Sequence, residues 1–312
     1  MGVILTPIFL EYYMLAFFIV FCSCLFQSCW YVLIKSSSNT ITTLIANVFG
    51  CLLYMPLMLL AGKDIYLLKN IWWLIILSGL ANGVVFWLVA YIFRLGSDIS
   101  FITPLRQGFV ILSSVIMSFL IGIFVHGKVN ITALATVGCF LIALGCFILP
   151  ILNFHEVKIK DYFNKITALC LLVGFFAWLS MYLDSYSLKS LGAGLSPFRK
   201  ACVFISPFRL ATCVGILPFL WFDKIKLGID AFNEKVDYKF GLIIGFSISL
   251  AYLLVCSAYS LVSDVSYIVA FRLMALPMTI IAGFIFYKEK VYLGKILGSI
   301  IILIGIAMTA LG

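Results

Sequence analysis

Charged side chains are scarce in this sequence, and their scarcity excludes a soluble domain as its main component. Only 11% of the 312 residues are Asp, Glu, Lys or Arg, whereas 64% are hydrophobic. Soluble domains are about one quarter charged and about one half apolar. Together with a mean hydropathy of +1.21, the composition predicts an integral membrane protein, and an all-α one, because a helix satisfies its own backbone in lipid.

Histidine is rarer still, and the arrangements that catalysis or metal binding would need are missing. The two histidines, His126 and His155, lie in links between apolar runs, and neither has a Ser, Cys or carboxylate partner at a useful spacing. Nearly all of the ten cysteines fall inside apolar runs, without nearby histidine or acidic residues. This favours helix packing over a metal site. We therefore expect no enzymatic activity, no cofactor and no metal.

The sequence also lacks a basic face for nucleic acid, although its net charge is +9. The lysines cluster in short links and do not alternate with aromatic residues on one face, so we expect no nucleic-acid partner. The same links bear on orientation in the membrane. Counting Lys and Arg in them favours external termini, but acidic residues interleave with the lysines of link 223–239, so the orientation stays open.

Apolar runs of about twenty residues follow one another along the chain, and each is long enough to cross about 30 Å of hydrocarbon as a helix. A more polar link at 155–165 divides them into two sets of five. The link at 223–239 is the longest and most charged, and we expect it to be a solvated loop. The sequence thus predicts ten membrane helices, at about 12–34, 41–61, 71–94, 100–125, 129–152, 166–188, 197–222, 240–261, 265–287 and 291–311.

One stretch occurs twice. Residues 97–106 (SDISFITPLR) return 166 residues later as 263–272 (SDVSYIVAFR), and in each copy an arginine follows the aspartate by eight residues. We interpret this as a duplication of a five-helix unit, with one repeat at 1–153 and the other at 154–312. Further pairs fit the same scheme, namely Gly79 with Gly245, Pro56 with Pro218, Gly138 with Gly298, and Gly145 with Gly305.

An odd number of helices in each repeat has a geometric consequence. The second repeat must enter the membrane in the opposite sense, so a pseudo-twofold axis in the membrane plane relates the two halves. Arg106 and Arg272 each lie about eight residues into their helices, which is roughly 12 Å at 1.5 Å per residue. Because this depth is counted from opposite faces, both arginines are expected near the middle of the membrane, where such transporters bind substrate.

Arg106, Arg209 and Arg272 are the candidate substrate-binding cations. An arginine at the centre of a membrane helix costs about 2.5–3.5 kcal/mol, so all three need an explanation. No acidic residue lies at matching depth, and Asp184 near a helix end is the closest. Guanidinium groups suit bidentate capture of carboxylate or phosphate. Alternatively, the arginines have structural roles, capping carbonyls, bonding Ser and Gln, snorkelling to an interface or, for Arg209, pairing with Asp184.

Four further residues are candidates for the same site. Gln27, Asn82 and Tyr252 are polar groups in otherwise apolar helices, so each is expected to face another helix or a wet cavity. Phe86 lies one turn after Asn82 and corresponds to Tyr252 at the repeat offset. One aromatic from each half would then flank the axis and could stack on a substrate ring. Packing in the helical core is the alternative.

The segment from Tyr91 to Gly122 resembles the drug/metabolite transporter superfamily, in particular its EamA-type members. The resemblance rests on Tyr91, Ser100, Pro104 and Arg106, and on an acidic residue that ends the helix of the second copy, Glu289. The first copy departs from the pattern with His126-Gly127, and Gln27 stands where a tryptophan is expected. The family implies a ten-helix, two-repeat secondary transporter with a central cavity and alternating access. It does not select the cargo.

From these observations we expect a secondary transporter of a small organic anion or zwitterion, such as an amino acid or an organic phosphate. Because the core offers no obvious carboxylate to carry a proton, exchange or facilitated movement is favoured over proton coupling. The alternatives are a flippase for a lipid-linked phosphate carrier, a drug or cation exporter, and a membrane protein without cargo. We expect a multi-pass protein of the bacterial cytoplasmic (inner) membrane, in contact with the lipid bilayer, as a monomer or homodimer.

Overall fold

The computed structural model describes residues 7–34, 40–95, 99–124, 131–151, 164–192, 194–228, 238–262, 264–288 and 291–312. Within these ranges the chain forms helices joined by turns, and no strand. The helices are α1 (Pro7–Ile34), α2 (Thr40–Leu60), the 3-10 helix η1 (Gly62–Asn70), α3 (Trp72–Arg94), α4 (Ile99–Phe124), α5 (Ala133–Ile148), α6 (Lys165–Ser190), α7 (Pro197–Leu227), α8 (Tyr238–Tyr259), α9 (Val265–Arg272), α10 (Ala275–Tyr287) and α11 (Leu293–Leu311).

Seven of these helices, α2, α3, α4, α6, α7, α8 and α11, are long and apolar enough to cross a membrane. Shorter apolar helical stretches occur at Met14–Ser28, Ala133–Ile148 and Val265–Ile281. Large apolar side chains cover the outside of the bundle, and Leu60 and Trp221 are 81% and 71% exposed. Water would disfavour so extensive an apolar surface. The chain is therefore a multi-pass α-helical membrane protein, as its composition predicts.

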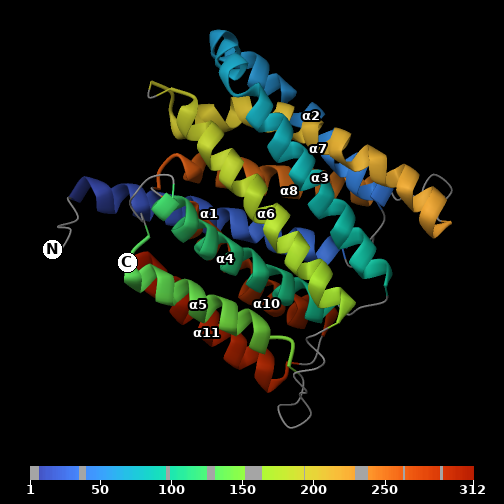
Figure 1. Cartoon of the computed structure of the whole chain (residues 1–312), viewed down its shortest axis with the longest axis vertical. Coiled ribbons are helices and arrows are strands. Elements are labelled where there is room, and N and C mark those ends of the chain that lie inside the picture. The colour runs from blue at the N-terminus through green and yellow to red at the C-terminus, as the bar shows by residue number, and fades with distance from the viewer. Residues whose placement is uncertain are drawn as a thin grey trace.

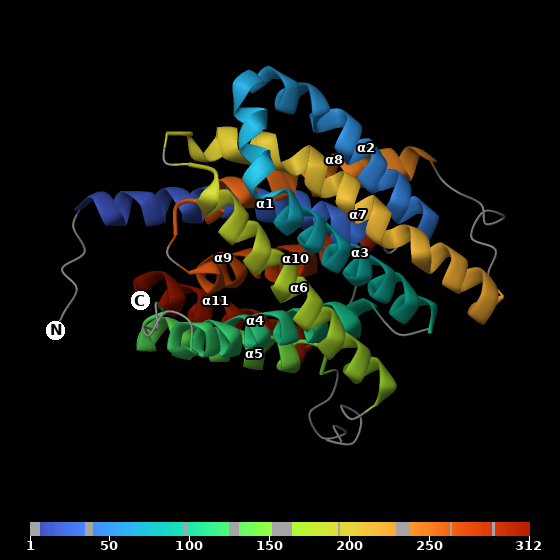
Figure 2. The same cartoon turned by 45° about the horizontal axis from the view of Figure 1, so that its top comes forward.

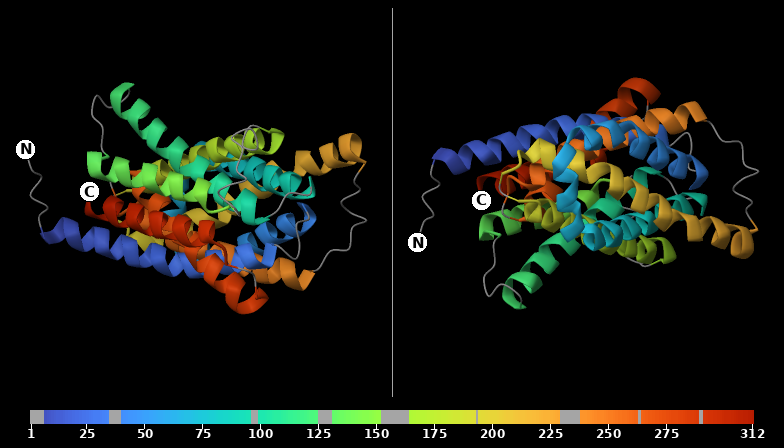
Figure 3. Two further views of the ribbon diagram at one scale, coloured as in Figure 1. Left: turned by 90° about the horizontal axis from the view of Figure 1, so that it is seen from below. Right: turned by 90° about the horizontal axis from the view of Figure 1, so that it is seen from above.

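The helices lie roughly along one direction, and α1 begins at the same end of the bundle where α11 ends (Figure 3). Figure 2 shows α5 and α11 side by side at one edge, with α2 and α7 toward the opposite edge. Between these edges, α3 packs on α6 and α7, and α1 packs on α8 (Figure 1). The interior of the bundle therefore receives side chains from both halves of the chain.

Glycine permits the close contact between α5 and α11. A Cβ built at Gly138 would lie 2.6 Å from the carbonyl oxygen of Gly305, and one built at Gly145 would lie 2.8 Å from that of Gly298. Two helix backbones can approach this closely only where no side chain stands between them. These glycines therefore serve close helix contact within the chain.

The prediction of one continuous helix at 265–287 is wrong. The structure has two helices there, because α9 ends at Arg272 and α10 begins at Ala275. Pro277 has no N–H to donate to the carbonyl of Leu273 four residues earlier. The backbone N–H of Leu276 donates to that carbonyl instead, at 3.0 Å.

Side chains of α1 bond to the carbonyl groups at this break. The Cys24 thiol donates to the carbonyl oxygens of Phe271 and Arg272, at 3.6 and 3.5 Å. The Ser28 hydroxyl donates to the carbonyl oxygen of Ala275, at 3.2 Å. Carbonyl groups inside an apolar bundle need such partners. The contact with α1 therefore stabilises the interruption between α9 and α10.

The expected solvated loop at 223–239 is wrong at its beginning, because α7 continues past Asp223. The Asp223 carboxylate is fully buried and forms an ion pair of 2.7 Å with Arg94 at the end of α3. Thr40 and Trp87 also donate to it, at 3.1 and 2.9 Å. A carboxylate can be buried only with such partners. This cluster joins the ends of α2, α3 and α7.

The other nine predicted segments coincide with helices to within five residues at each end. Some residues on which the sequence comparison depends lie outside the described ranges, and the structure does not bear on them. They are Ser97, Asp98, His126, Gly127, His155, Ser263 and Glu289.

Candidate functional site

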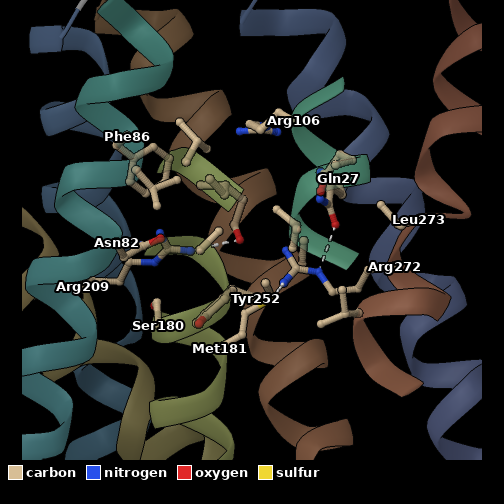
Figure 4. Close-up of a pocket in the computed structure, with 18 residues that line it drawn as sticks. Gln27, Asn82, Phe86, Arg106, Ser180, Met181, Arg209, Tyr252, Arg272 and Leu273 are labelled. Carbon is tan, nitrogen blue, oxygen red and sulfur yellow. Dashed lines mark hydrogen bonds between the residues drawn. The ribbon is translucent and has the colours of Figure 1, made fainter. Parts of the chain in front are cut away.

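A cavity of about 110 Å³ lies inside the bundle, between helices from both halves of the chain. Its wall includes three arginines, and its described lining residues include no Asp or Glu. Figure 4 shows the arginines approaching the cavity from different helices. The structure brings all seven sequence-predicted site residues to this one cavity, namely Gln27 from α1, Asn82 and Phe86 from α3, Arg106 from α4, Arg209 from α7, Tyr252 from α8 and Arg272 from α9.

Arg272 occupies the last position of α9, directly before the helix break. Its Nε donates to the amide oxygen Oε1 of Gln27 at 3.4 Å, and its Nη1 lies 3.2 Å from the sulfur of Met181. Both partners also line the cavity. Discontinuous helices in membrane transporters place free backbone groups and helix ends at the substrate site. The position of Arg272 at such a break therefore suits ligand binding.

Arg106 enters the cavity from α4, two residues after Pro104. Its side chain is largely buried, with 7% of its surface exposed. Figure 4 shows Arg106 apart from Arg272, and the amide of Gln27 directed toward Arg272. An anion between the two arginines would meet a cation from each half of the chain. Planar guanidinium groups can each donate two hydrogen bonds to one carboxylate or phosphate.

Arg209 is the most deeply buried of the three arginines, with 1% of its surface exposed. It donates from Nη1 to Oδ1 of Asn47 at 2.8 Å and from Nη2 to the carbonyl oxygen of Ile248 at 3.1 Å. Its guanidinium carbon lies 5.1 Å from the centre of the Tyr252 ring, within the range of a cation–π contact. The hydrogen bonds of Arg209 thus go to Asn47 and Ile248, and not to Asp184 as one alternative has it.

Two aromatic residues contribute apolar surface to the cavity. Phe86 and Tyr252 both line it, and each is 9% exposed. The Tyr252 ring stacks on Phe208, with 4.9 Å between ring centres and 12° between ring planes. Asn82, one turn before Phe86, donates to the hydroxyl oxygen of Thr212 at 3.3 Å. The wall therefore combines cationic, amide and aromatic groups.

Asp184 is a residue that sequence reasoning left out of the site. Its side chain is fully buried next to the cavity, where it accepts hydrogen bonds from the hydroxyl groups of Ser78, at 2.5 Å, and Tyr252. Its place near the end of a predicted helix argued against a depth that matches the arginines. Helical periodicity is the signal that could have found it, because Ala177, Ser180 and Asp184 lie on one side of a helix, and the first two line the cavity.

Comparison with known proteins shows the fold. No family model matches the chain, and no curated protein matches it. Seventeen solved chains match. One of them, described as "Crystal structure of protein", has a TM-score of 0.70 at 12% sequence identity, over 95% of this chain and 97% of that chain. At this identity the likeness shows a shared fold, which covers nearly the whole of both chains.

Proposed function

We propose that this protein is a secondary transporter of a small organic anion or zwitterion, of the EamA type within the drug/metabolite transporter superfamily. The observation that carries the proposal is the convergence of Arg106, Arg209 and Arg272 on one cavity whose described lining residues include no Asp or Glu. Planar guanidinium groups from different helices suit bidentate hydrogen bonding to a carboxylate or phosphate. Such a group on the cargo would bind between them.

The volume of the cavity suits a small molecule as cargo. On the scale used for buried water, one molecule needs about 10–15 Å³. The cavity of about 110 Å³ therefore has room for several water molecules or one small metabolite. Arg106 and Arg272 would hold its negative group, while Phe86 and Tyr252 would contact the rest. An amino acid or a small organic phosphate fits this description.

The pattern of helix contacts supports ten membrane helices in two inverted repeats, at 1–153 and 154–312. If α1 to α5 correspond to α6, α7, α8, the α9–α10 pair and α11, most contacts occur in equivalent pairs. The α1–α8 contact corresponds to α3–α6, and α2–α8 corresponds to α3–α7. The α2–α7 and α5–α11 contacts correspond to themselves, as expected for helices that meet across a twofold axis.

The glycine contacts follow the same rule. A Cβ built at Gly79 would meet Ala211 and Thr212 on α7, and one built at Gly245 would meet Ala46 on α2. Gly79 and Gly245 are 166 residues apart, and so are Ala46 and Thr212. Equivalent glycines therefore contact equivalent helices at equivalent heights. Alternating access in this architecture would rock one set of helices against the other around the cavity.

A thermal-shift experiment on the purified full-length protein tests the proposal. We expect a panel of small carboxylates, amino acids and organic phosphates to contain a ligand that raises the unfolding temperature, since a ligand at 100 times its Kd stabilises by about 2.7 kcal/mol. Arg272→Gln and Arg106→Gln should each weaken binding roughly 10- to 150-fold, the equivalent of about 1.5–3 kcal/mol for a charged hydrogen bond. Arg199→Gln is the matched control, because the Arg199 side chain is 53% exposed.

If both cavity variants bind and transport anions as well as the wild-type protein does, the proposal is refuted. A panel in which only cations stabilise the protein would point to drug or cation export instead, for which the described lining residues offer no acidic partner. Uptake of the stabilising anion into proteoliposomes then separates a transporter from a membrane protein that binds a ligand without moving it.

A groove on the side of the bundle favours one second candidate, a flippase for a lipid-linked phosphate. The groove has a volume of about 880 Å³, and Leu105, Phe109 and Phe147 contribute to its largely apolar wall. Leu105 directly precedes Arg106, so a lipid tail in the groove would lie near the arginine cavity. Ala168→Trp would fill the groove. Loss of binding by a polyprenyl phosphate, with binding of free phosphate unchanged, would favour the flippase.

A further inference from the structure

The Asp184 carboxyl lies in the interior of a membrane protein with no exposed surface. The Tyr252 hydroxyl donates to its Oδ2, and the Ser78 hydroxyl lies 2.5 Å from its Oδ1. The Ser180 hydroxyl lies 2.9 Å from that of Ser78. Because Tyr252 and Ser180 both line the arginine cavity, two hydroxyl routes connect the cavity to this carboxyl.

The next residues of α6 line a second polar pocket. It has a volume of about 340 Å³, and its wall includes Tyr182, Ser185 and Lys189 from α6, together with Asp264 at the start of α9. On α6, residues Ser180 and Met181 face the arginine cavity, whereas Ser185 and Lys189 face the second pocket. Asp184 therefore lies on α6 between residues that line the arginine cavity and residues that line the second pocket.

The charges around Asp184 come mainly from the cavity arginines. The cations that act on it electrostatically are Arg272 and Arg209. Burial opposes ionisation of the carboxyl, while the two cations favour it. The groups that face it from the helices packed against α6 are Ser78 from α3, Arg209 from α7, Tyr252, Cys256 and Tyr259 from α8, and Arg272 from α9. Arg106 from α4 lines the arginine cavity, and Lys189 and Asp264 line the second pocket.

An anion in the cavity would change this balance. Its charge would lie beside Arg272, in the cavity that Arg209 also lines, and it would offset the positive field of these arginines at the carboxyl. A second negative charge nearby disfavours ionisation of the first. Binding of an anion would therefore promote protonation of Asp184. By linkage, protonation of Asp184 must strengthen anion binding by the same factor.

We propose that Asp184 is the proton-binding site that couples proton uptake to binding of the anionic cargo, so that one proton travels with each anion. This inference rests on the proposed function. The proton is taken up on the Asp184 carboxyl as the anion enters the cavity, and it leaves when the anion leaves. The summed charge of the cavity and the carboxyl is then the same with and without cargo. The sequence favours exchange over proton coupling, and the buried position of Asp184 is the reason to revise that expectation.

Infrared titration of the full-length protein in liposomes tests the proposal. We expect the C=O band of a protonated carboxyl to appear as pH falls in the wild-type protein and to be missing from Asp184→Asn. Sulfate and succinate serve as probe anions. Either should move the midpoint of the band upward by about 0.7 to 2 pH units, which corresponds to the 5- to 150-fold couplings typical between sites. In Arg272→Gln this anion-induced shift should shrink or vanish.

Tyr252→Phe supplies a second variant in case Asp184→Asn fails to fold. It keeps the ring that stacks on Phe208 and removes the hydroxyl that donates to the carboxylate. Because a hydrogen bond to the charged form favours that form, its loss should move the midpoint upward without any anion. An Asp184 band that stays constant from pH 5 to pH 9 overturns the proposal.

The outcomes separate this inference from the proposed function. If sulfate or succinate raises the unfolding temperature of the wild-type protein but leaves the infrared midpoint unchanged, the proton linkage is wrong and anion binding stands. If neither these nor the other anions of the panel bind, the proposed function fails and the linkage fails with it. A midpoint shift of the same size in Arg272→Gln would show that the anion acts on Asp184 from elsewhere, which also contradicts the proposal.

Discussion

The guanidinium group of Arg94 lies 2.7 Å from the carboxylate of Asp223, where α3 and α7 end side by side. Asp223 is fully buried, and the Arg94 side chain is 14% exposed. Removing one partner of a buried ion pair leaves an uncompensated charge, which typically costs about 3–5 kcal/mol. The pair thus identifies a point where a single substitution should weaken the fold without touching the cavity.

Arg94→Gln should therefore lower the free energy of unfolding by about 3–5 kcal/mol, measured as the unfolding midpoint in detergent. Arg199→Gln is the control, because Arg199 pairs with Asp64 at 2.5 Å but has a 53% exposed side chain. An exposed pair contributes about 0–1 kcal/mol. If both variants lose the same free energy of unfolding, the Arg94–Asp223 pair does not stabilise the fold more than the exposed pair does.

The close contact of α5 with α11 gives a second prediction. A Cβ at Gly145 would lie 2.7 Å from Cγ1 of Ile302 and 2.8 Å from the Gly298 carbonyl oxygen. Gly145→Ala should thus force the helices apart and cost about 1–3 kcal/mol, the usual range for overpacking. Gly194→Ala is the matched control, since a Cβ there meets nothing within 4 Å. Unfolding midpoints compare the two, and a Gly145→Ala protein as stable as the control would be the contrary result.

The helix break gives a third prediction. Cys24 donates to two carbonyl groups at the end of α9, one of them that of Arg272. Cys24→Ala leaves these groups without that donor, and a buried unsatisfied group costs about 1–3 kcal/mol, with a weak thiol donor at the lower end. We expect a lower unfolding midpoint and weaker sulfate binding, because the backbone that carries Arg272 loses an anchor. Cys22→Ala, on the same helix but only partly buried, should change neither.

Composition and the spacing of similar residues in the two halves allowed part of the fold and of the site to be predicted. The all-helical membrane class follows from composition, and it is confirmed. The repeat offset of 166 residues brought Phe86, Tyr252, Arg106 and Arg272 together as candidates, and the structure places all four at one cavity. The repeat offset identifies equivalent residues of the two halves. Equivalent residues that lie close to the predicted twofold axis are close to each other as well. The ten membrane helices and the inverted repeats stay predictions.

The misplaced features depend on partners that are distant in the sequence. The burial of Asp223 requires Arg94 from another helix, at a separation of 129 residues. The break after Arg272 is stabilised by Cys24, at a separation of 248 residues. Asp184 can be buried beside the cavity because Ser78 and Tyr252, from two other helices, donate hydrogen bonds to its carboxylate. Polar groups in lipid need partners, but the sequence does not say which helix provides them.

The last prediction separates the roles of two arginines that line the same cavity. Arg209 donates to Asn47 and to the Ile248 carbonyl, so it joins α2, α7 and α8. Arg209→Gln should leave buried groups unsatisfied and lower the free energy of unfolding by about 1–3 kcal/mol. Arg272 lies at the end of a short helix and is only partly buried. Arg272→Gln should therefore change stability less and weaken sulfate binding more.

Both variants make the same chemical change, Arg to Gln, so each serves as the control for the other. The measurements are the unfolding midpoint without ligand and the Kd for sulfate, on the full-length protein. Charge loss at either site reduces the positive field in the cavity, so some loss of affinity is expected in Arg209→Gln too. Wild-type stability together with abolished binding in Arg209→Gln would mean that Arg209 contacts the anion directly, and that its bonds to Asn47 and Ile248 do not stabilise the fold.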